Sequence, residues 1–242
     1  MLSIRGLEKR FGGLLAVEGF DIDLAPGLIT ALIGPNGAGK TTVFNMVTGV
    51  LTADAGAVHL GPHALLGMRP HRVARLGVAR TFQDLRLFSH MTVRDNVLAS
   101  VERTPWLWQR GPGAARHARV DAALEQTGLG ARAKDRAADL PYADAKFLSL
   151  ARVLATEAPV WLLDEPASGL DPASRDRFCA LLRAAAAAGT TICLIEHNLD
   201  IVAALSDRIA FLDRGRKLAE GEPQSILRDP ELAAIYFGER RA

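Results

Sequence analysis

Residues 34 to 41 combine glycines, a lysine and a threonine in the spacing G-x-x-x-x-G-K-T, directly after the apolar run from Leu28 to Ile33. Glycines allow a backbone to approach a ligand closely, and the N–H groups that open a helix attract phosphate oxygens. In this pattern the Lys40 ammonium reaches the β- and γ-phosphates, and the Thr41 hydroxyl is suited to Mg²⁺. A tight turn by itself would need neither side chain. The pattern therefore predicts a nucleoside triphosphate site that uses Gly34, Asn36, Gly37, Ala38, Gly39, Lys40, Thr41 and Thr42.

Two carboxylates, Asp164 and Glu165, follow a second apolar segment, Val160 to Leu163. One carboxylate can orient a water on Mg²⁺, and the next can polarise a water for in-line attack on the γ-phosphate. Solvated charges at the end of a strand are the alternative interpretation. The phosphate loop in the same chain favours the catalytic one, with Asp164 on the metal side and Glu165 as the group that activates water.

These residues need a scaffold that brings the ends of several strands together. Short apolar or alternating segments predict strands, and each buried strand is followed by a helical pattern. This alternation is typical of an α/β fold, a mostly parallel sheet with helices on both faces that binds ligands at the carboxyl ends of its strands. The predicted strands are 2–7, 20–24, 28–33, 160–163 and 191–195, and the predicted helices include 42–47 and 172–189.

The pattern changes to helices between about Asp84 and Leu150, which predicts an inserted helical subdomain. Thr92 and Asp95 have the spacing of a capping box at the start of one of its helices. The stretch from Thr104 to Gly113 contains two tryptophans, two prolines and two glycines, which predicts a packed surface loop or a broken helix.

Length and charge exclude several classes of protein. The 242 residues suit one domain with a subdomain. The net charge of +2 is too small for a dedicated nucleic-acid binder. No apolar run reaches the roughly eighteen residues of a membrane span. The first ten residues also lack the order of charges of a secretory signal.

The chain has two cysteines, Cys179 and Cys193, which lie in apolar segments without metal-ligand spacing. This arrangement predicts two buried free thiols and a reducing cytoplasm.

Taken together, these motifs resemble the ATPase subunits of ABC transporters over nearly the whole chain, from Leu2 to about Gly238. Further motifs stand in the family's order: Gln83 as the Q-loop, 168–171 as the D-loop and His197 as the switch histidine. The resemblance implies the P-loop NTPase fold, in which a RecA-like core carries an antiparallel β subdomain. It implies a single domain with its core at 1–83 and 156–242 and its helical subdomain at 84–155.

The resemblance also assigns roles to residues. It implies ATP and Mg²⁺ as ligands, Glu165 and His197 as catalytic residues, and adenine contacts from Phe11 and Val17. The implied metal ligands are Thr41, Gln83 and Asp164, and the implied D-loop residues are Ser168 and Asp171. The implied partners are a second ATPase subunit, transmembrane permease subunits and, indirectly, a solute-binding protein, with no nucleic acid. The implied location is peripheral, on the cytoplasmic face of the inner membrane.

Within the family, the chain is most similar to the ATPases of branched-chain amino-acid importers. ATPases of lipid or lipopolysaccharide exporters are the nearest alternative. ABC ATPases of DNA repair or translation are disfavoured, because neither coiled-coil insertions nor a second cassette is present. Adenylate-type kinases are disfavoured because they need a second substrate-phosphate site rich in arginine on a mobile lid, whereas the arginines of this sequence are scattered. The similar stretches are 9–13, 80–83, 87–88, 91–93, 220–223 and 235–238.

The family's signature segment, usually L-S-G-G-Q or L-S-Y-G-Q, corresponds here to Leu140, Pro141, Tyr142, Ala143 and Asp144. In the family this segment faces the γ-phosphate bound to the other subunit. Pro141 removes a hydroxyl and an N–H, and Asp144 adds a negative charge where it is unfavourable. This departure from the usual signature predicts a heterodimer with a partner whose signature is intact. Such a heterodimer would have one good site, on the phosphate loop of this chain, and one weak site, on that of the partner. The alternatives are a regulatory subunit that hardly turns ATP over, and a substitution that is tolerated because backbone donors still reach the phosphate.

Overall fold

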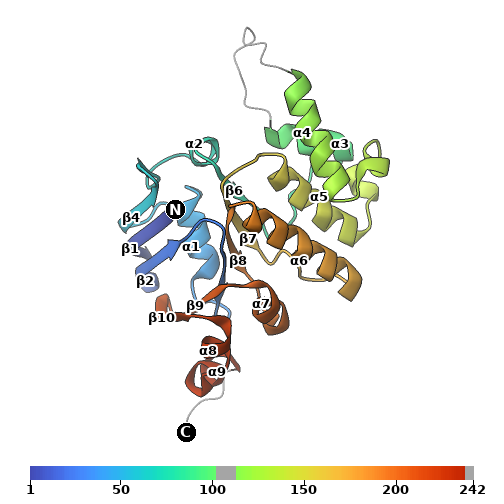
Figure 1. The fold of residues 1–242 in the computed structure, drawn as a ribbon. Coiled ribbons are helices and arrows are strands. Elements are labelled where there is room, and N and C mark those ends of the chain that lie inside the picture. Colours follow the sequence, from blue (N-terminus) through green and yellow to red (C-terminus); the bar gives the residue numbers. More distant parts are fainter. Residues whose placement is uncertain (102–112, 238–242) are drawn as a thin grey trace.

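The computed structural model describes residues 1–101 and 113–237 (Figure 1). Its larger sheet has six strands in the order β10-β9-β3-β8-β7-β6. The pairs β3–β8, β3–β9, β7–β8 and β6–β7 are parallel, and β9–β10 is antiparallel. The predicted mostly parallel sheet is therefore confirmed. The strands are β3 (Ile29–Ile33), β6 (Val78–Arg80), β7 (Val160–Asp164), β8 (Thr191–Ile195), β9 (Arg208–Asp213) and β10 (Arg216–Gly221).

A second, antiparallel sheet of four strands has the order β2-β1-β4-β5. Its strands are β1 (Leu2–Phe11), β2 (Leu14–Leu24), β4 (Ala55–Leu60) and β5 (His63–Ala64). Gly12 and Gly13 form the turn between β1 and β2, which are both longer than the sequence predicted because they pair along most of their length. Figure 1 shows this sheet on the side of the molecule opposite the helices α3 and α4.

Strands β3, β7 and β8 are buried throughout, which is why their sequences are apolar without alternation. Alternate residues belong to two hydrophobic clusters. Leu32, Leu162 and Cys193 lie in one with α1 (Lys40–Val47) and the antiparallel sheet. Leu163 and Leu194 lie in the other with α6 (Pro172–Ala187). The sheet is thus covered on both faces.

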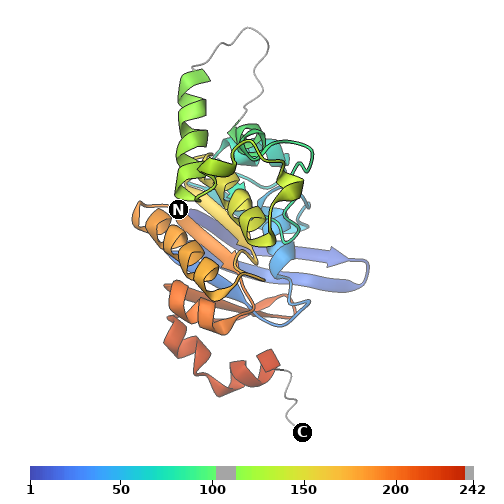
Figure 2. The same cartoon turned by 90° about the vertical axis from the view of Figure 1, so that its right-hand side faces the viewer.

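Helices α3 (Val93–Val101), α4 (Gly113–Gln126) and α5 (Tyr142–Leu154) lie between β6 and β7 in the chain and gather at one end of the molecule (Figures 1 and 2). Two 3₁₀ turns, Gly130–Arg132 and Ala137–Asp139, connect α4 to α5. The limits of a helical subdomain at 84–155 stay a prediction. The remaining helices are α2 (Pro70–Arg75), α7 (Leu199–Leu205), α8 (Pro223–Leu227) and α9 (Pro230–Phe237).

Several details differ from the sequence predictions. Helix α1 begins at Lys40 rather than Thr42, and α6 ends at Ala187, two residues before Gly189.

The two cysteines differ in burial. Cys193 is buried, which raises the pKa of its thiol to about 12. Cys179 is only half-buried, so the prediction of two buried thiols was wrong for Cys179. Of the predicted loop at 104–113, all but Gly113 lies outside the described residues. Among the described helices, none has the length and apolar content to cross a membrane.

The Thr92 side chain caps the start of α3, which is one half of the predicted capping box. Thr92 Oγ1 accepts the Asp95 N–H at 3.0 Å, and the Thr92 hydroxyl donates to Asp95 Oδ2 at 2.7 Å. We expect Thr92→Ala to lower the free energy of unfolding by about 1 kcal/mol, because it leaves an N–H at the helix start without a partner. Denaturant unfolding measures this change. Exposed Thr52 is the control, and an equal loss in Thr52→Ala would contradict the capping role.

Candidate nucleotide site

The phosphate loop joins β3 to α1, and its conformation requires glycine at two positions. Gly34 has φ +147°, and a Cβ there would lie 1.9 Å from the Leu212 carbonyl oxygen. Gly39 has φ +101°, and a Cβ there would lie 2.5 Å from the Ala16 carbonyl oxygen. The loop is also tied to β9 and β10 through the Gly215 N–H, which donates to the Ala38 carbonyl at 3.0 Å. Its shape therefore depends on residues far away in the sequence.

The loop leaves the N-terminus of α1 open to an anion. Gly39 is the N-cap, no side chain caps the helix, and its first turn has no acidic residue. The first N–H groups of a helix have no partner within the helix, and the helix dipole favours negative charge there. Asn36, Gly37 and Thr41 are exposed, and Thr42 is half-buried. These donors fit the phosphates of ATP.

Lys40 is the first residue of α1 and is only 5% exposed. Its ammonium group donates to the carbonyl oxygens of Gly34 at 2.7 Å and Pro35 at 2.9 Å. Burial lowers the pKa of Lys40, while Glu165 and Asp164 act in the opposite direction. The loop thus holds the Lys40 ammonium beside its backbone donors. The charges of Glu165 and Asp164 are close enough to affect the pKa of this ammonium group.

Asp164 is the last residue of β7, at the same edge of the sheet as the phosphate loop, and is 3% exposed. Its Oδ2 lies 3.6 Å from Nη2 of Arg80, and its N–H donates to Thr81 Oγ1 at 3.1 Å. Burial raises the pKa of Asp164, and the Arg80 charge opposes this. Arg80 also donates to Asn45 Oδ1 at 2.8 Å, so it connects α1 to Asp164. No sequence motif indicated a role for Arg80 or Thr81, since their partners are distant in the chain.

Glu165 and His197, the two residues predicted to be catalytic, lie beside each other. Glu165 Oε1 lies 3.2 Å from His197 Nε2. Glu165 has φ +47°, an unusual conformation for a residue other than glycine, and its N–H donates to the Ile195 carbonyl at 2.9 Å. The His197 carbonyl accepts the Tyr236 hydroxyl of α9 at 2.9 Å, a contact that no sequence motif indicated.

The remaining predicted ligand residues are Phe11, Val17 and Gln83. Phe11 is 48% exposed at the end of β1, and the Lys9 ammonium lies 5.6 Å from the centroid of its ring. Val17 is fully buried, and its Cγ2 lies 3.2 Å from the place that a Cβ on Gly39 would occupy. Gln83 is exposed after β6. The adenine contacts of Phe11 and Val17, and the metal contact of Gln83, stay predictions.

A hydroxyl, an amide and one carboxylate, those of Thr41, Gln83 and Asp164, fit Mg²⁺, which binds through few protein ligands together with phosphates and waters. Within residues 1–101 and 113–237, no three His, Cys, Asp or Glu side chains are grouped to form a metal cage of their own.

The predicted signature segment lies at the start of α5, with Pro141 as the N-cap and no side-chain capping bond. Asp144 forms an ion pair with Arg132, whose Nε also lies 3.6 Å from Asp135. The charge expected to oppose a phosphate is thus partly compensated within the chain. In the D-loop, Ser168 contributes its carbonyl to the Tyr142 hydroxyl at 3.3 Å. Asp171 caps α6, accepting the Ser174 N–H at 3.0 Å.

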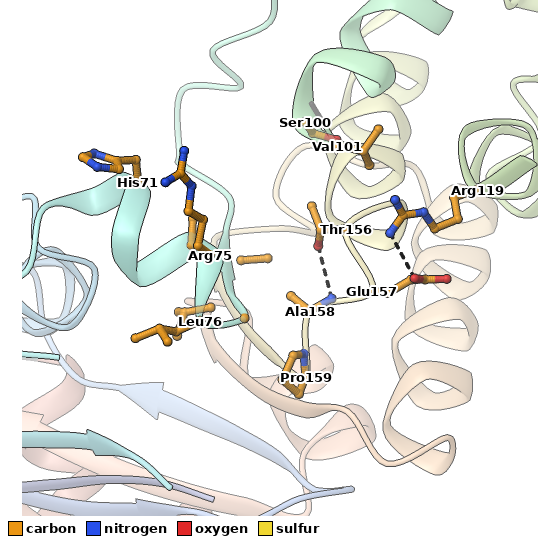
Figure 3. A pocket seen from close by; sticks show the side chains of 14 residues that line it. His71, Arg75, Leu76, Ser100, Val101, Arg119, Thr156, Glu157, Ala158 and Pro159 are labelled. Carbon is orange, nitrogen blue, oxygen red and sulfur yellow. Dashed lines mark hydrogen bonds and ion pairs between the residues drawn. The ribbon is translucent and has the colours of Figure 1, made fainter. Parts of the chain in front are cut away.

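A separate cavity of about 410 Å³ lies at the opposite edge of the sheet, beside the starting residues of β6 and β7. Figure 3 shows Arg75 of α2, Ser100 of α3 and the ion pair between Arg119 and Glu157 around it. None of the predicted site residues lines this cavity. The nucleotide site and this cavity therefore use different ends of the same strands.

Comparisons with known proteins agree with this site. The sequence profile of the ABC transporter family matches residues 17–168. The chain is 41% identical over 254 residues to the high-affinity branched-chain amino acid transport ATP-binding protein LivG of Escherichia coli, covering 99% of this chain and 98% of that protein. It is 37% identical, with the same coverage, to the transport ATP-binding protein BraF of Pseudomonas aeruginosa.

Solved structures give the same result. A nucleotide-free ATP-binding cassette from an ABC transporter is 28% identical, with a TM-score of 0.88 over 98% of both chains. A cassette in its ADP conformation is 29% identical, with the same TM-score and coverage. The predicted P-loop NTPase fold is confirmed by these structures. Because the profile covers more than half of the chain and the relatives match nearly all of it, the chain belongs to the ABC transporter family, as one of its ATP-hydrolysing cassettes.

Proposed function

We propose that this chain is the ATPase subunit of a membrane importer for branched-chain amino acids or related small solutes. The observation that carries the proposal is the gathering of the phosphate loop, Asp164 and the Glu165–His197 pair at one edge of the sheet. The names of the relatives that match the chain end to end support the class of cargo. The subunit would lie on the cytoplasmic face of the membrane, bound to permease subunits that receive solute from a binding protein.

In this proposal the residues of the chain divide the work of hydrolysis. Backbone N–H groups of residues 36–42 and the Lys40 ammonium hold the phosphates in place. Thr41, Gln83 and Asp164 would hold Mg²⁺, which would supply positive charge to neutralise the phosphates. Glu165 accepts a proton from the attacking water, and His197 orients Glu165 and contacts the γ-phosphate.

We further propose that the partner across the nucleotide is a different ATPase subunit. Pro141 offers neither a hydroxyl nor an N–H at the start of α5, although Arg132 compensates part of the Asp144 charge. Two copies of this chain would give two sites that each lack these donors. A partner with an intact signature would complete one good site on the phosphate loop of this chain.

The test is steady-state ATPase activity of the purified chain, alone and titrated with its co-purifying ATPase and permease subunits. We expect a rise of about tenfold or more with the partner, since each lost charge-assisted hydrogen bond is worth about 1.5–3 kcal/mol. Partner carrying a signature Ser→Ala substitution is the control. Equal activity with and without the partner would contradict the heterodimer.

The departure in the signature also favours a second function, a regulatory subunit that binds ATP and hardly hydrolyses it. The same titration separates the two, because such a subunit stays inactive with every partner. Uptake of labelled leucine by cells that lack this chain, with and without a plasmid copy, tests the cargo. Unchanged leucine uptake, together with altered lipid export, would favour an exporter.

A further inference from the structure

Lys146 of α5 is a buried cation that no motif singled out. It is 3% exposed, and its ammonium group donates to the carbonyl oxygen of Glu165 at 2.7 Å. Lysine is almost never fully buried unless a partner compensates it. The carboxylates that face it are those of Glu196, Glu165 and Asp164, and they oppose the effect of burial, which lowers the pKa of Lys146. A side chain in this position has a specific partner in the catalytic segment.

The segment that Lys146 contacts has an unusual backbone. Glu165 has φ +47°, and such conformations persist only where the surroundings hold them. Its N–H is bound to the Ile195 carbonyl, and its carbonyl is bound to Lys146. Two residues later, the Ala167 N–H donates to the buried carboxylate of Glu196 at 2.9 Å. Lys146 and Glu196 thus each bind the main chain of this turn, at Glu165 and at Ala167.

Helix α5 also contacts the other end of this turn. One helical turn before Lys146, the Tyr142 hydroxyl donates to the Ser168 carbonyl at 3.3 Å. A Cβ on Gly169 would lie 2.7 Å from Tyr142 Cε1, so the ring packs directly on the backbone there. The helix that begins at the signature segment therefore touches both ends of residues 165–169.

We propose that Lys146 is a positioning residue that fixes the backbone of Glu165 and so keeps its carboxylate against His197. Because Lys146 and Tyr142 are on the same helix, the catalytic carboxylate of this chain is coupled to its own signature segment. In the proposed function, that segment would face the nucleotide of the partner subunit. The inference rests on the role of Glu165 in the proposed function.

The experiment compares Lys146→Met and Lys146→Arg in the assembled transporter. Methionine is unbranched and only one atom shorter than lysine but donates no hydrogen bond, whereas arginine keeps the charge and the donor. We expect Lys146→Met to lower kcat for ATP hydrolysis by about 10²-fold, as small displacements of a catalytic group do, with unchanged KM and ATP binding. Lys146→Arg should recover most of kcat.

Arg152→Met is the matched control, because Arg152 is a basic residue of the same helix whose guanidinium donates to the Arg86 carbonyl, away from Glu165. It should keep kcat within a few fold. Lys146→Leu repeats the test if the methionine variant does not fold.

Unchanged kcat in Lys146→Met, or a loss of ATP binding that accompanies the loss of kcat, would overturn the positioning role. A failure of the proposed function can be distinguished from a failure of the positioning role. In the first case Glu165→Gln would keep its turnover, regardless of the effect of the Lys146 variants.

Discussion

Glu165→Gln should reduce ATP turnover by about 10²–10⁴-fold, the usual contribution of a general base, while ATP binding stays near its original affinity. Glutamine has nearly the same shape but cannot accept a proton from the attacking water. Its side chain can still contact His197, 3.2 Å from the present carboxylate oxygen, so the local fold should persist. Phosphate release measures turnover, and equilibrium binding of a fluorescent ATP analogue measures affinity.

Glu222→Gln is the control for this change, because Glu222 is exposed and its side chain does not cap α8. It removes the same charge far from the nucleotide and should keep full turnover. Persistent turnover in Glu165→Gln would remove Glu165 from its role, and a parallel loss of ATP binding would show that the variant disturbs the phosphate loop instead.

Lys40→Ala should weaken ATP binding by about 10–100-fold, since hydrogen bonds to charged groups contribute about 1.5–3 kcal/mol. The reason is the position of the ammonium group, which lies on the carbonyl oxygens of Gly34 and Pro35 beside the open N-terminus of α1. Titration calorimetry gives the affinity. Thermal unfolding gives a second measure, because a ligand that binds only the folded state raises Tm and the variant should lose this rise.

Lys134→Ala is suitable as the control, because Lys134 is exposed in the connection between α4 and α5. Both its affinity and its rise in Tm should match those of the unchanged protein. An unaltered affinity in Lys40→Ala would mean that backbone N–H groups alone carry phosphate binding in this loop.

The strands that support the site were predictable, because β3, β7 and β8 are buried on both faces and their sequences are apolar without interruption. The phosphate loop was predictable because its chemistry resides in eight consecutive residues. Strands β4, β5, β6, β9 and β10 were not predicted. Strand β6, for example, has only three residues, and its partner β7 is about eighty positions later in the chain.

The residues that support the catalytic groups could not be found from local patterns. Lys146 stands in a helix whose sequence does not distinguish an exposed lysine from a buried one, and its partner Glu165 is 19 positions away. Arg80 precedes Gln83 in a recognisable stretch, but its contacts with Asn45 and Asp164 depend on how α1 and β7 pack. Such contacts are set by tertiary structure, which a motif does not encode.

Two contacts that shape the phosphate loop have a consequence for biosynthesis. The Leu212 carbonyl lies close to Gly34, and the Gly215 N–H donates to the Ala38 carbonyl. The glycine loop leaves the ribosome long before the residues that shape it, because Leu212 and Gly215 come far later in the sequence than Gly34 and Ala38. Central strand β3 likewise pairs with β8 and β9, which are more than 150 positions later. Contacts so distant in sequence are slow to form. A nascent chain would therefore become competent for nucleotide only after residues 212–215 have emerged and folded against the loop.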